Sequence, residues 1–186
     1  MKPAVIVIDM LEDFVRGELK CERAQRTLEP LGRLLDAARS QRVPVIFSND
    51  AHLPGVDHEF NIWGEHAVAG TPGADVIAEL EPKEGDYQVP KRRYSGFYGT
   101  DLEMLLREHG VDTVILTGLH TNICVRHTAA DAFYRGYRVI VPTDTVEAFT
   151  AEEHEDGLEY LKKVYGAELS SVDELLGIMA EQPIKV

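Results

Sequence analysis

Short apolar runs rich in β-branched residues recur along the chain. The clearest lie at residues 4–8, 43–47, 111–116 and 137–141, and weaker candidates lie at 87–89 and 167–169. Continuous apolar runs of this length are typical of strands that are buried on both faces of a parallel sheet. We therefore expect a strand at each of these positions.

Helical patterns lie between the apolar runs. Apolar residues recur at helical spacing over 28–38, where Pro30 suits the first turn of a helix. A second helix is predicted over 123–135, and Gly136 is expected to end it. Three more helix starts are predicted by capping boxes, in which a hydroxyl and a Glu three residues later satisfy unpaired backbone N–H groups. They lie at residues 100–103, 150–153 and 171–174, and Gly110 is expected to end the first of these helices.

The alternation of strands and helices predicts the fold class. It indicates a single α/β domain over residues 1–186, with a doubly wound, mostly parallel sheet and helices on both faces. Ligands of such sheets bind beyond the carboxyl ends of the strands, so functional residues are expected there. Residues 51–72 break the pattern, and a long irregular loop inside a compact domain is usually functional.

Charge and cysteine content narrow the classes of function. The 186 residues carry a formal net charge of −13, which disfavours nucleic acid and anionic membranes as partners. The first apolar run ends at Asp9 and is too short for a signal peptide or a membrane span, so we expect a cytoplasmic protein. Cys21 and Cys124 do not make a disulfide framework, and a free reactive thiol is therefore possible. We assign no role to Cys21.

Three residues near the predicted strand ends form a set suited to acyl transfer. Cys124 falls in the first turn of a predicted helix, where the helix N-terminus would lower the pKa of its thiol. Asp9 ends the first strand and could act as a general base, and Lys91 would supply a cation. Each alone could be structural: a buried cysteine, a capping aspartate or a solvated lysine. Together they supply a nucleophile, a base and a positive charge.

A second set of residues could bind a metal ion. Asp50 and His52 are two residues apart, so their side chains point the same way in an extended segment, and His66 follows in the same loop. One carboxylate and two imidazoles suit zinc or iron with open positions for water or substrate. His58 is a competing ligand candidate, and the alternative is that these histidines are solvated loop residues.

Two aromatic residues are candidates for the wall of a substrate pocket. Trp63 lies in the irregular loop, and Phe14 follows the first strand closely. Large aromatic side chains can flank a planar substrate, although ordinary core packing is the alternative for both, and the stronger one for Phe14.

Four stretches of the chain carry a resemblance to a known family. They read VIDMLEDF at 7–14, WGEHAVAGTPGA at 63–74, KRRYSGF at 91–97 and GLHTNICV at 118–125. In this order they resemble the isochorismatase-like cysteine hydrolases, and within these the nicotinamidases. The resemblance implies that Asp9, Lys91 and Cys124 are a catalytic triad. It also implies an oxyanion hole formed by the backbone N–H groups of His120 and Cys124, with a cis peptide bond between Leu119 and His120.

The same resemblance implies a cofactor and a pocket. Asp50, His52 and His66 take the positions of ligands to a divalent metal, with zinc as the first candidate, and Trp63 matches an aromatic residue of the substrate pocket. Family members often form dimers or larger homo-oligomers. The chain departs from the nicotinamidases at Ala51, where they usually have tryptophan, and at His120, where they commonly have a small residue. His120 would narrow the substrate pocket or add a polar contact to it.

The sequence therefore predicts a cysteine-dependent amidohydrolase of a small amide. The first hypothesis is hydrolysis of nicotinamide to nicotinate and ammonia through a thioester on Cys124, with Phe14, Trp63 and His120 contacting the substrate. Three alternatives remain open. In the first, the same type of enzyme hydrolyses another amide, a ureido compound or a vinyl ether. In the second, a metal-bound water is the nucleophile and Cys124 is structural. In the third, the protein binds a ligand and has no activity.

Overall fold

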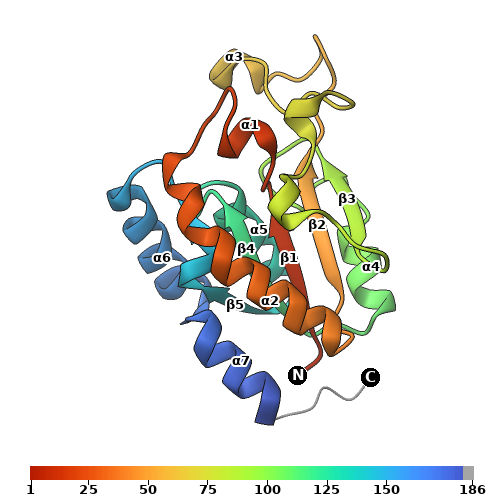
Figure 1. Cartoon of the computed structure of the whole chain (residues 1–186), viewed down its shortest axis with the longest axis vertical. Coiled ribbons are helices and arrows are strands. Elements are labelled where there is room, and N and C mark those ends of the chain that lie inside the picture. Colours follow the sequence, from red (N-terminus) through yellow and green to blue (C-terminus); the bar gives the residue numbers. More distant parts are fainter. Residues whose placement is uncertain (182–186) are drawn as a thin grey trace.

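A parallel sheet forms the centre of the structure, a computed structural model that describes residues 1–181 (Figure 1). Six strands follow the order β3-β2-β1-β4-β5-β7, and a seventh, β6, pairs with the end of β4; all of these pairings are parallel. The strands are β1 (Pro3–Ile8), β2 (Val45–Asp50), β3 (Tyr87–Lys91), β4 (Thr113–Leu119), β5 (Arg138–Pro142), β6 (Val146–Glu147) and β7 (Glu168–Ser170).

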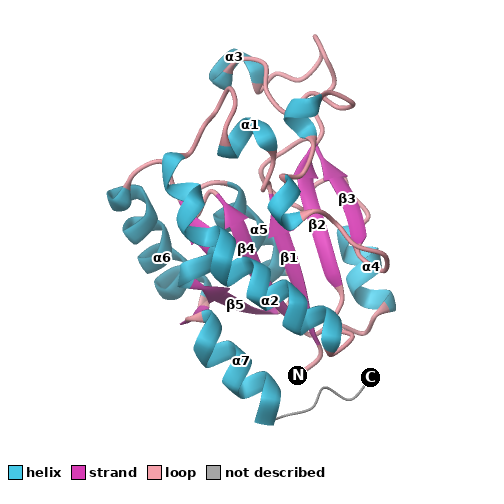
Figure 2. Cartoon of the chain, in the orientation of Figure 1, coloured by secondary structure: helices cyan, strands magenta, loops and turns pink. Residues whose placement is uncertain are grey.

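Helices cover both faces of the sheet. Helices α2 and α7 pack on the face that presents Val5 and Val7, and α4, α5 and α6 pack on the face that presents Ile6 and Ile8 (Figures 1 and 2). The doubly wound α/β fold expected from the sequence is confirmed. The helices are α1 (Glu12–Val15), α2 (Leu28–Ser40), α3 (Phe60–Trp63), α4 (Leu102–Glu108), α5 (Cys124–Tyr134), α6 (Ala151–Tyr165) and α7 (Val172–Glu181).

None of the helices within residues 1–181 has both the length and the apolar character needed to cross a bilayer. Short 3-10 helices lie at Glu22–Thr27, Pro72–Ala74, Ala78–Leu80 and Thr143–Thr145.

Four strands begin one or two residues later than the apolar runs predicted. Val43, Val111, Tyr137 and Ala167 are each the first residue of a predicted strand. The backbone N–H of each instead donates to a carbonyl in the last turns of the preceding helix, at 2.9–3.2 Å. A residue with positive φ comes just before each of them, as in the Schellman closure of a helix. These apolar residues therefore complete helix ends before the sheet begins.

Two of the three predicted capping boxes form. Thr150 and Glu153 exchange the reciprocal hydrogen bonds at the start of α6, and residues 171 and 174 do the same at the start of α7. The prediction at 100–103 is wrong, because Glu103 pairs with Arg107 and Arg135 while the Thr100 hydroxyl donates to the carbonyl of Gly96. The short elements α1, α3 and β6 were not predicted.

The carboxyl ends of the central strands lie beside one another, beneath α1, α3 and the loops that join them (Figure 2). One contact there depends on a glycine. Gly118, near the end of β4, has a φ of +95°, and a Cβ at this position would lie 2.0 Å from the carbonyl oxygen of Ile8 on β1. Only a residue without a side chain lets β4 run this close to β1 immediately before the segment 119–124.

We expect Gly118→Ala to lower the free energy of unfolding by roughly 3 kcal/mol, since the change adds both a steric clash and a strained backbone. Gly32→Ala is the matched control, because nothing lies within 4 Å of a Cβ placed there on α2. It should raise the free energy of unfolding by about 0.5–1 kcal/mol. Urea denaturation followed by circular dichroism measures both, and equal effects would contradict the close approach.

Candidate active site

Four buried side chains meet at the carboxyl edge of the sheet. Asp9 follows β1, Asp50 ends β2, Lys91 ends β3, and Cys124 is the first residue of α5. The Lys91 ammonium lies 2.7 Å from Asp9 Oδ2, 2.7 Å from Asp50 Oδ1 and 3.6 Å from Cys124 Sγ. The structure thus brings together the three residues of the predicted triad and adds Asp50 as a second acidic neighbour of the lysine.

The backbone around Asp9 fixes the direction of its carboxylate. Asp9 has a φ of +52°, a conformation that aspartate tolerates better than most residues. Its N–H donates to Asn49 Oδ1 at 3.1 Å, and its own Oδ1 accepts the N–H of Asp50 at 2.7 Å. These contacts tie the end of β1 to the end of β2, and they leave Oδ2 of Asp9 facing Lys91.

Burial and neighbouring charges shift the pKa values of this cluster in opposite directions. Burial, reinforced by the Asp50 carboxylate, raises the pKa of Asp9 to about 6 against the opposing pull of Lys91. Burial also lowers the pKa of Lys91, but the Asp50 and Asp9 carboxylates outweigh it and hold that pKa well above its ordinary value. The lysine is therefore a permanent cation, and Asp9 is a carboxylate able to accept a proton near neutral pH.

The expected lowering of the Cys124 pKa is wrong. Burial raises the pKa of this thiol well above its ordinary value, and the Asp9 and Asp50 carboxylates act in the same direction against Lys91. Burial, the largest cause, and the two carboxylates together outweigh the effect of the Lys91 cation. The resting side chain is a protonated thiol, so a nucleophilic role needs a base beside it.

The three predicted metal ligands lie together in the structure. Each of Asp50, His52 and His66 offers one potential ligand atom, and these three atoms lie within 4.8 Å of one another. All three residues are buried. Asp50 uses Oδ1 for Lys91, while its Oδ2 lies 3.6 Å from His52 Nε2. The Nδ1 of His66 lies 2.8 Å from the carbonyl of Gly64, which leaves Nε2 of this ring for a ligand role.

His58 is not part of this cluster, and the suggestion that it competes as a ligand is wrong. It is exposed, and its Nδ1 contacts the Arg93 guanidinium at 3.2 Å. The neighbouring Glu59 is buried instead, with Oε2 3.8 Å from His52 Nε2. Sequence reasoning missed this carboxylate because it lies in the irregular loop, where no periodicity indicates which side chains point inward.

A narrow cavity opens beside Cys124 and is walled mainly by aromatic side chains. Phe14, Trp63 and His120, the predicted substrate contacts, all line it. The His120 ring stacks on Phe149 with centroids 4.1 Å apart, and burial lowers the pKa of His120 to about 4, so the ring is neutral. The peptide bond between Leu119 and His120 is cis, as the resemblance implied. Asp50, His66 and Cys124 line it too, and the wall residues that sequence reasoning missed are Leu19, Glu59, Tyr94, Ile123 and Phe149.

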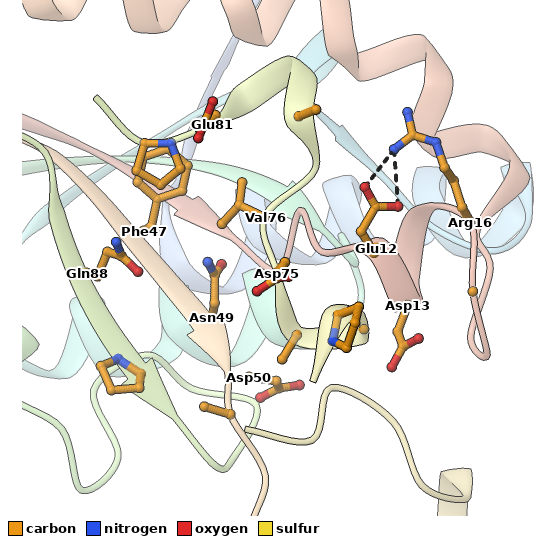
Figure 3. A pocket seen from close by; sticks show the side chains of 18 of the residues that line it. Glu12, Asp13, Arg16, Phe47, Asn49, Asp50, Asp75, Val76, Glu81 and Gln88 are labelled. Atoms are coloured by element: carbon orange, nitrogen blue, oxygen red, sulfur yellow. Dashed lines mark hydrogen bonds and ion pairs between the residues drawn. The ribbon is translucent and has the colours of Figure 1, made fainter. Parts of the chain in front are cut away.

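A larger hollow is lined by residues of β2, β3, α1 and the segment 72–82 (Figure 3). Asn49 and Asp50 line it, together with the acidic residues Glu12, Asp13, Asp75 and Glu81. Arg16 pairs there with Glu12, while Cys124 and Lys91 do not line the hollow. Asp50 therefore borders both spaces, whereas Cys124 lines only the narrow aromatic cavity.

The sheet and the buried acid–lysine–cysteine cluster at its carboxyl edge are features of a hydrolytic enzyme. The model of the Isochorismatase domain matches residues 3–174, and the chain belongs to this family. It is an isochorismatase-family amidohydrolase, an enzyme that acts on C–N bonds.

Three solved structures illustrate the range of its relatives. The N-carbamoylsarcosine amidase from Thermoplasma acidophilum is 46% identical with a TM-score of 0.87, covering 93% of this chain and 98% of that one. The nicotinamidase PncA from Bacillus subtilis is 34% identical with a TM-score of 0.87, covering 92% and 100%. The pyrazinamidase of Pyrococcus horikoshii in complex with zinc is 30% identical with a TM-score of 0.84, covering 92% and 99%.

We expect Lys91→Met to lower the free energy of unfolding by about 3 kcal/mol, because it leaves two buried carboxylates without their cation. Lys83→Met is the control, since the pair between Lys83 and Asp36 is exposed and should contribute little. Urea unfolding of both variants in the presence of a chelator is the measurement. Equal stability of the two variants would show that Lys91 does not hold the cluster together.

Proposed function

We propose that this chain hydrolyses a small amide through a thioester on Cys124. The position of the Lys91 ammonium carries the proposal, since it lies within 2.7 Å of two carboxylates and 3.6 Å from the sulfur. A lysine enclosed in this way is not a solvated surface residue. It stabilises negative charge as a proton moves between Cys124 and Asp9.

The first half of the reaction forms the acyl enzyme. Asp9, whose carboxylate lies within 4.8 Å of Cys124 Sγ, takes the thiol proton. The thiolate attacks the amide carbonyl carbon, and the backbone N–H groups of His120 and Cys124 hold the developing oxyanion, worth about 3 kcal/mol for each donor. The C–N bond breaks as Asp9 returns the proton to the nitrogen, and ammonia leaves.

The second half of the reaction releases the acid. Asp9 is again an unprotonated carboxylate after ammonia has left, and it takes a proton from a water molecule. The resulting hydroxide attacks the thioester carbonyl, the same N–H groups hold the oxyanion, and the C–S bond breaks. Cys124 recovers its proton from Asp9, so one base serves both halves.

We further propose that Asp50, His52 and His66 hold a divalent metal ion, with zinc as the first candidate. His52 Nε2 is fully buried and has no hydrogen-bond partner within residues 1–181, and such an atom in a site of carboxylate and imidazole suits a metal. Glu59 is close enough to His52 to be considered as a further ligand. When bound, the metal supplies a Lewis-acid contact that orients a ring nitrogen of the substrate or a water molecule.

Nicotinamide is the first substrate to test. Related proteins act on nicotinamide, pyrazinamide and N-carbamoylsarcosine, according to their names, so the family alone does not select one amide. The aromatic wall of Phe14, Trp63 and Phe149 favours a planar substrate. His120 occupies part of the same cavity, which favours a small one.

We expect Cys124→Ala to abolish ammonia release from nicotinamide, since no other thiol lies in the cluster. The metal content of the protein should stay unchanged. Cys21→Ala is the matched control, because this second buried thiol donates to the carbonyl of Ala148 and lies outside the cavity. Ammonia release is measured with a coupled assay over a panel of nicotinamide and other small amides, and zinc by elemental analysis.

The results separate the remaining candidates. Turnover that survives in Cys124→Ala but stops on chelation would replace the thioester with attack by a metal-activated water. Cys124-dependent release from another amide alone would keep the mechanism and reject nicotinamide. No release from any amide of the panel would count against the thioester proposal for substrates of this class.

We expect His120→Ala to raise the ratio of kcat/KM for nicotinamide to that for acetamide about tenfold, because removing the ring widens the cavity for the larger amide. His109→Ala, at the end of α4 and away from the cavity, should leave the ratio unchanged. Steady-state kinetics with both amides is the measurement. A ratio that falls would mean that the His120 ring contacts the substrate favourably instead of limiting its size.

A further inference from the structure

Asp57 is a buried carboxylate with several partners and no assigned role. Its side chain is fully buried in the loop between β2 and α3. Its Oδ2 lies 3.0 Å from His52 Nδ1 and accepts the backbone N–H of Leu53 at 2.9 Å. The Arg92 guanidinium binds both carboxylate oxygens. Asp57 therefore connects a predicted metal ligand to a residue from a different part of the chain.

The contact with Asp57 determines how the His52 ring is oriented. Arg92 donates to both oxygens of Asp57, and the backbone N–H of Leu53 donates to its Oδ2, so the carboxylate serves these neighbours as a hydrogen-bond acceptor. Nδ1 of His52 must then carry a proton and donate it. The nitrogen left for a metal is Nε2, which faces Asp50 and Glu59 and has no hydrogen-bond partner in the described part of the chain.

Arg92 comes directly after Lys91, so Asp57 also connects the loop to the end of β3. Arg92 Nε lies 3.0 Å and 3.1 Å from the two oxygens of Asp57, and Arg93 approaches the same carboxylate at 3.7 Å. The loop that carries His52 is thereby attached to the segment that carries the lysine of the catalytic cluster. Movement of one segment would displace the other.

We propose that Asp57 is a positioning residue that sets the tautomer and orientation of His52, and that Arg92 holds Asp57 in place for this purpose. This inference rests on the proposed metal site. A histidine ligand that donates its second nitrogen to a carboxylate is fixed in orientation and is a more basic ligand. Removing such a carboxylate typically weakens metal affinity about 10- to 100-fold.

A different reading is that Asp57 only anchors the loop, and the chain offers a close control for it. Asp86 is half-buried as a residue, but its side chain is only 3% exposed. It also accepts a backbone N–H, from Lys83, and binds the Arg39 guanidinium through two nitrogens. It precedes β3 and so lies at the opposite end of that strand from Lys91. The two aspartates differ mainly in that Asp57 contacts a histidine.

The experiment compares zinc affinity of the full chain with that of Asp57→Asn and Asp86→Asn. Each protein is stripped with a chelator and titrated with Zn²⁺ against a chromophoric competitor, and the thermal midpoint of each metal-free protein is recorded. We expect about a 10- to 100-fold weaker zinc affinity for Asp57→Asn alone. The two variants should lose similar thermal stability, because each loses the same kind of ion pair.

Arg92→Gln provides a second test that leaves the histidine contact in place. We expect it to weaken zinc binding less than Asp57→Asn does, and Arg39→Gln to leave it unchanged. If Asp57→Asn does not fold, the comparison between these two arginine variants decides the question.

The outcomes distinguish the inference from the proposed metal site. The inference would be overturned, and the metal site left standing, by one pattern of affinities. In it the parent chain binds zinc, and the Asp57 and Asp86 variants, or the two arginine variants, bind it equally well. A parent chain that does not bind zinc would overturn the metal site, and the role of Asp57 with it.

Discussion

The site depends on one ammonium group enclosed between two carboxylates. Lys91 is fully buried, and its contacts with Asp9 and Asp50 make that burial tolerable, since an unpaired charge in such a place is strongly unfavourable. Lys91 and Asp50 end β3 and β2, and Asp9 directly follows β1, the next strand in the order β3-β2-β1. The sheet therefore brings the charges together, and the ion pairs in turn hold the strand ends in register.

Asp50 lies between the buried lysine cluster and the candidate metal site. One carboxylate oxygen faces Lys91 in the buried acid–lysine–cysteine cluster, and the other faces His52 in the candidate metal site. Asp57 adds a second connection between the same segments, through Arg92. The two sites are thus joined by a few polar contacts through Asp50 and Asp57.

The sequence was sufficient to predict the fold class and the residues at the strand ends. Parallel strands must place Asp9, Asp50, Lys91 and the 118–124 segment along one edge, whatever the details of the loops. Strand starts were less predictable, because residues such as Val43 and Val111 look like strand residues and yet close the preceding helices. The cavity wall at Phe149 and the buried Glu59 and Asp57 were missed, since an irregular segment gives no periodic signal for burial.

The pKa of Cys124 shows why local sequence rules fail inside a cluster. The position of a cysteine at a helix start favours its thiolate, but that rule assumes no stronger charges nearby. Here two carboxylates and burial favour the neutral thiol. The same surroundings raise the pKa of Asp9 to about 6, which makes it a better proton acceptor than an ordinary aspartate. The two shifts belong together, because the burial and negative charge that keep the Cys124 thiol protonated also raise the proton affinity of Asp9, the proposed base.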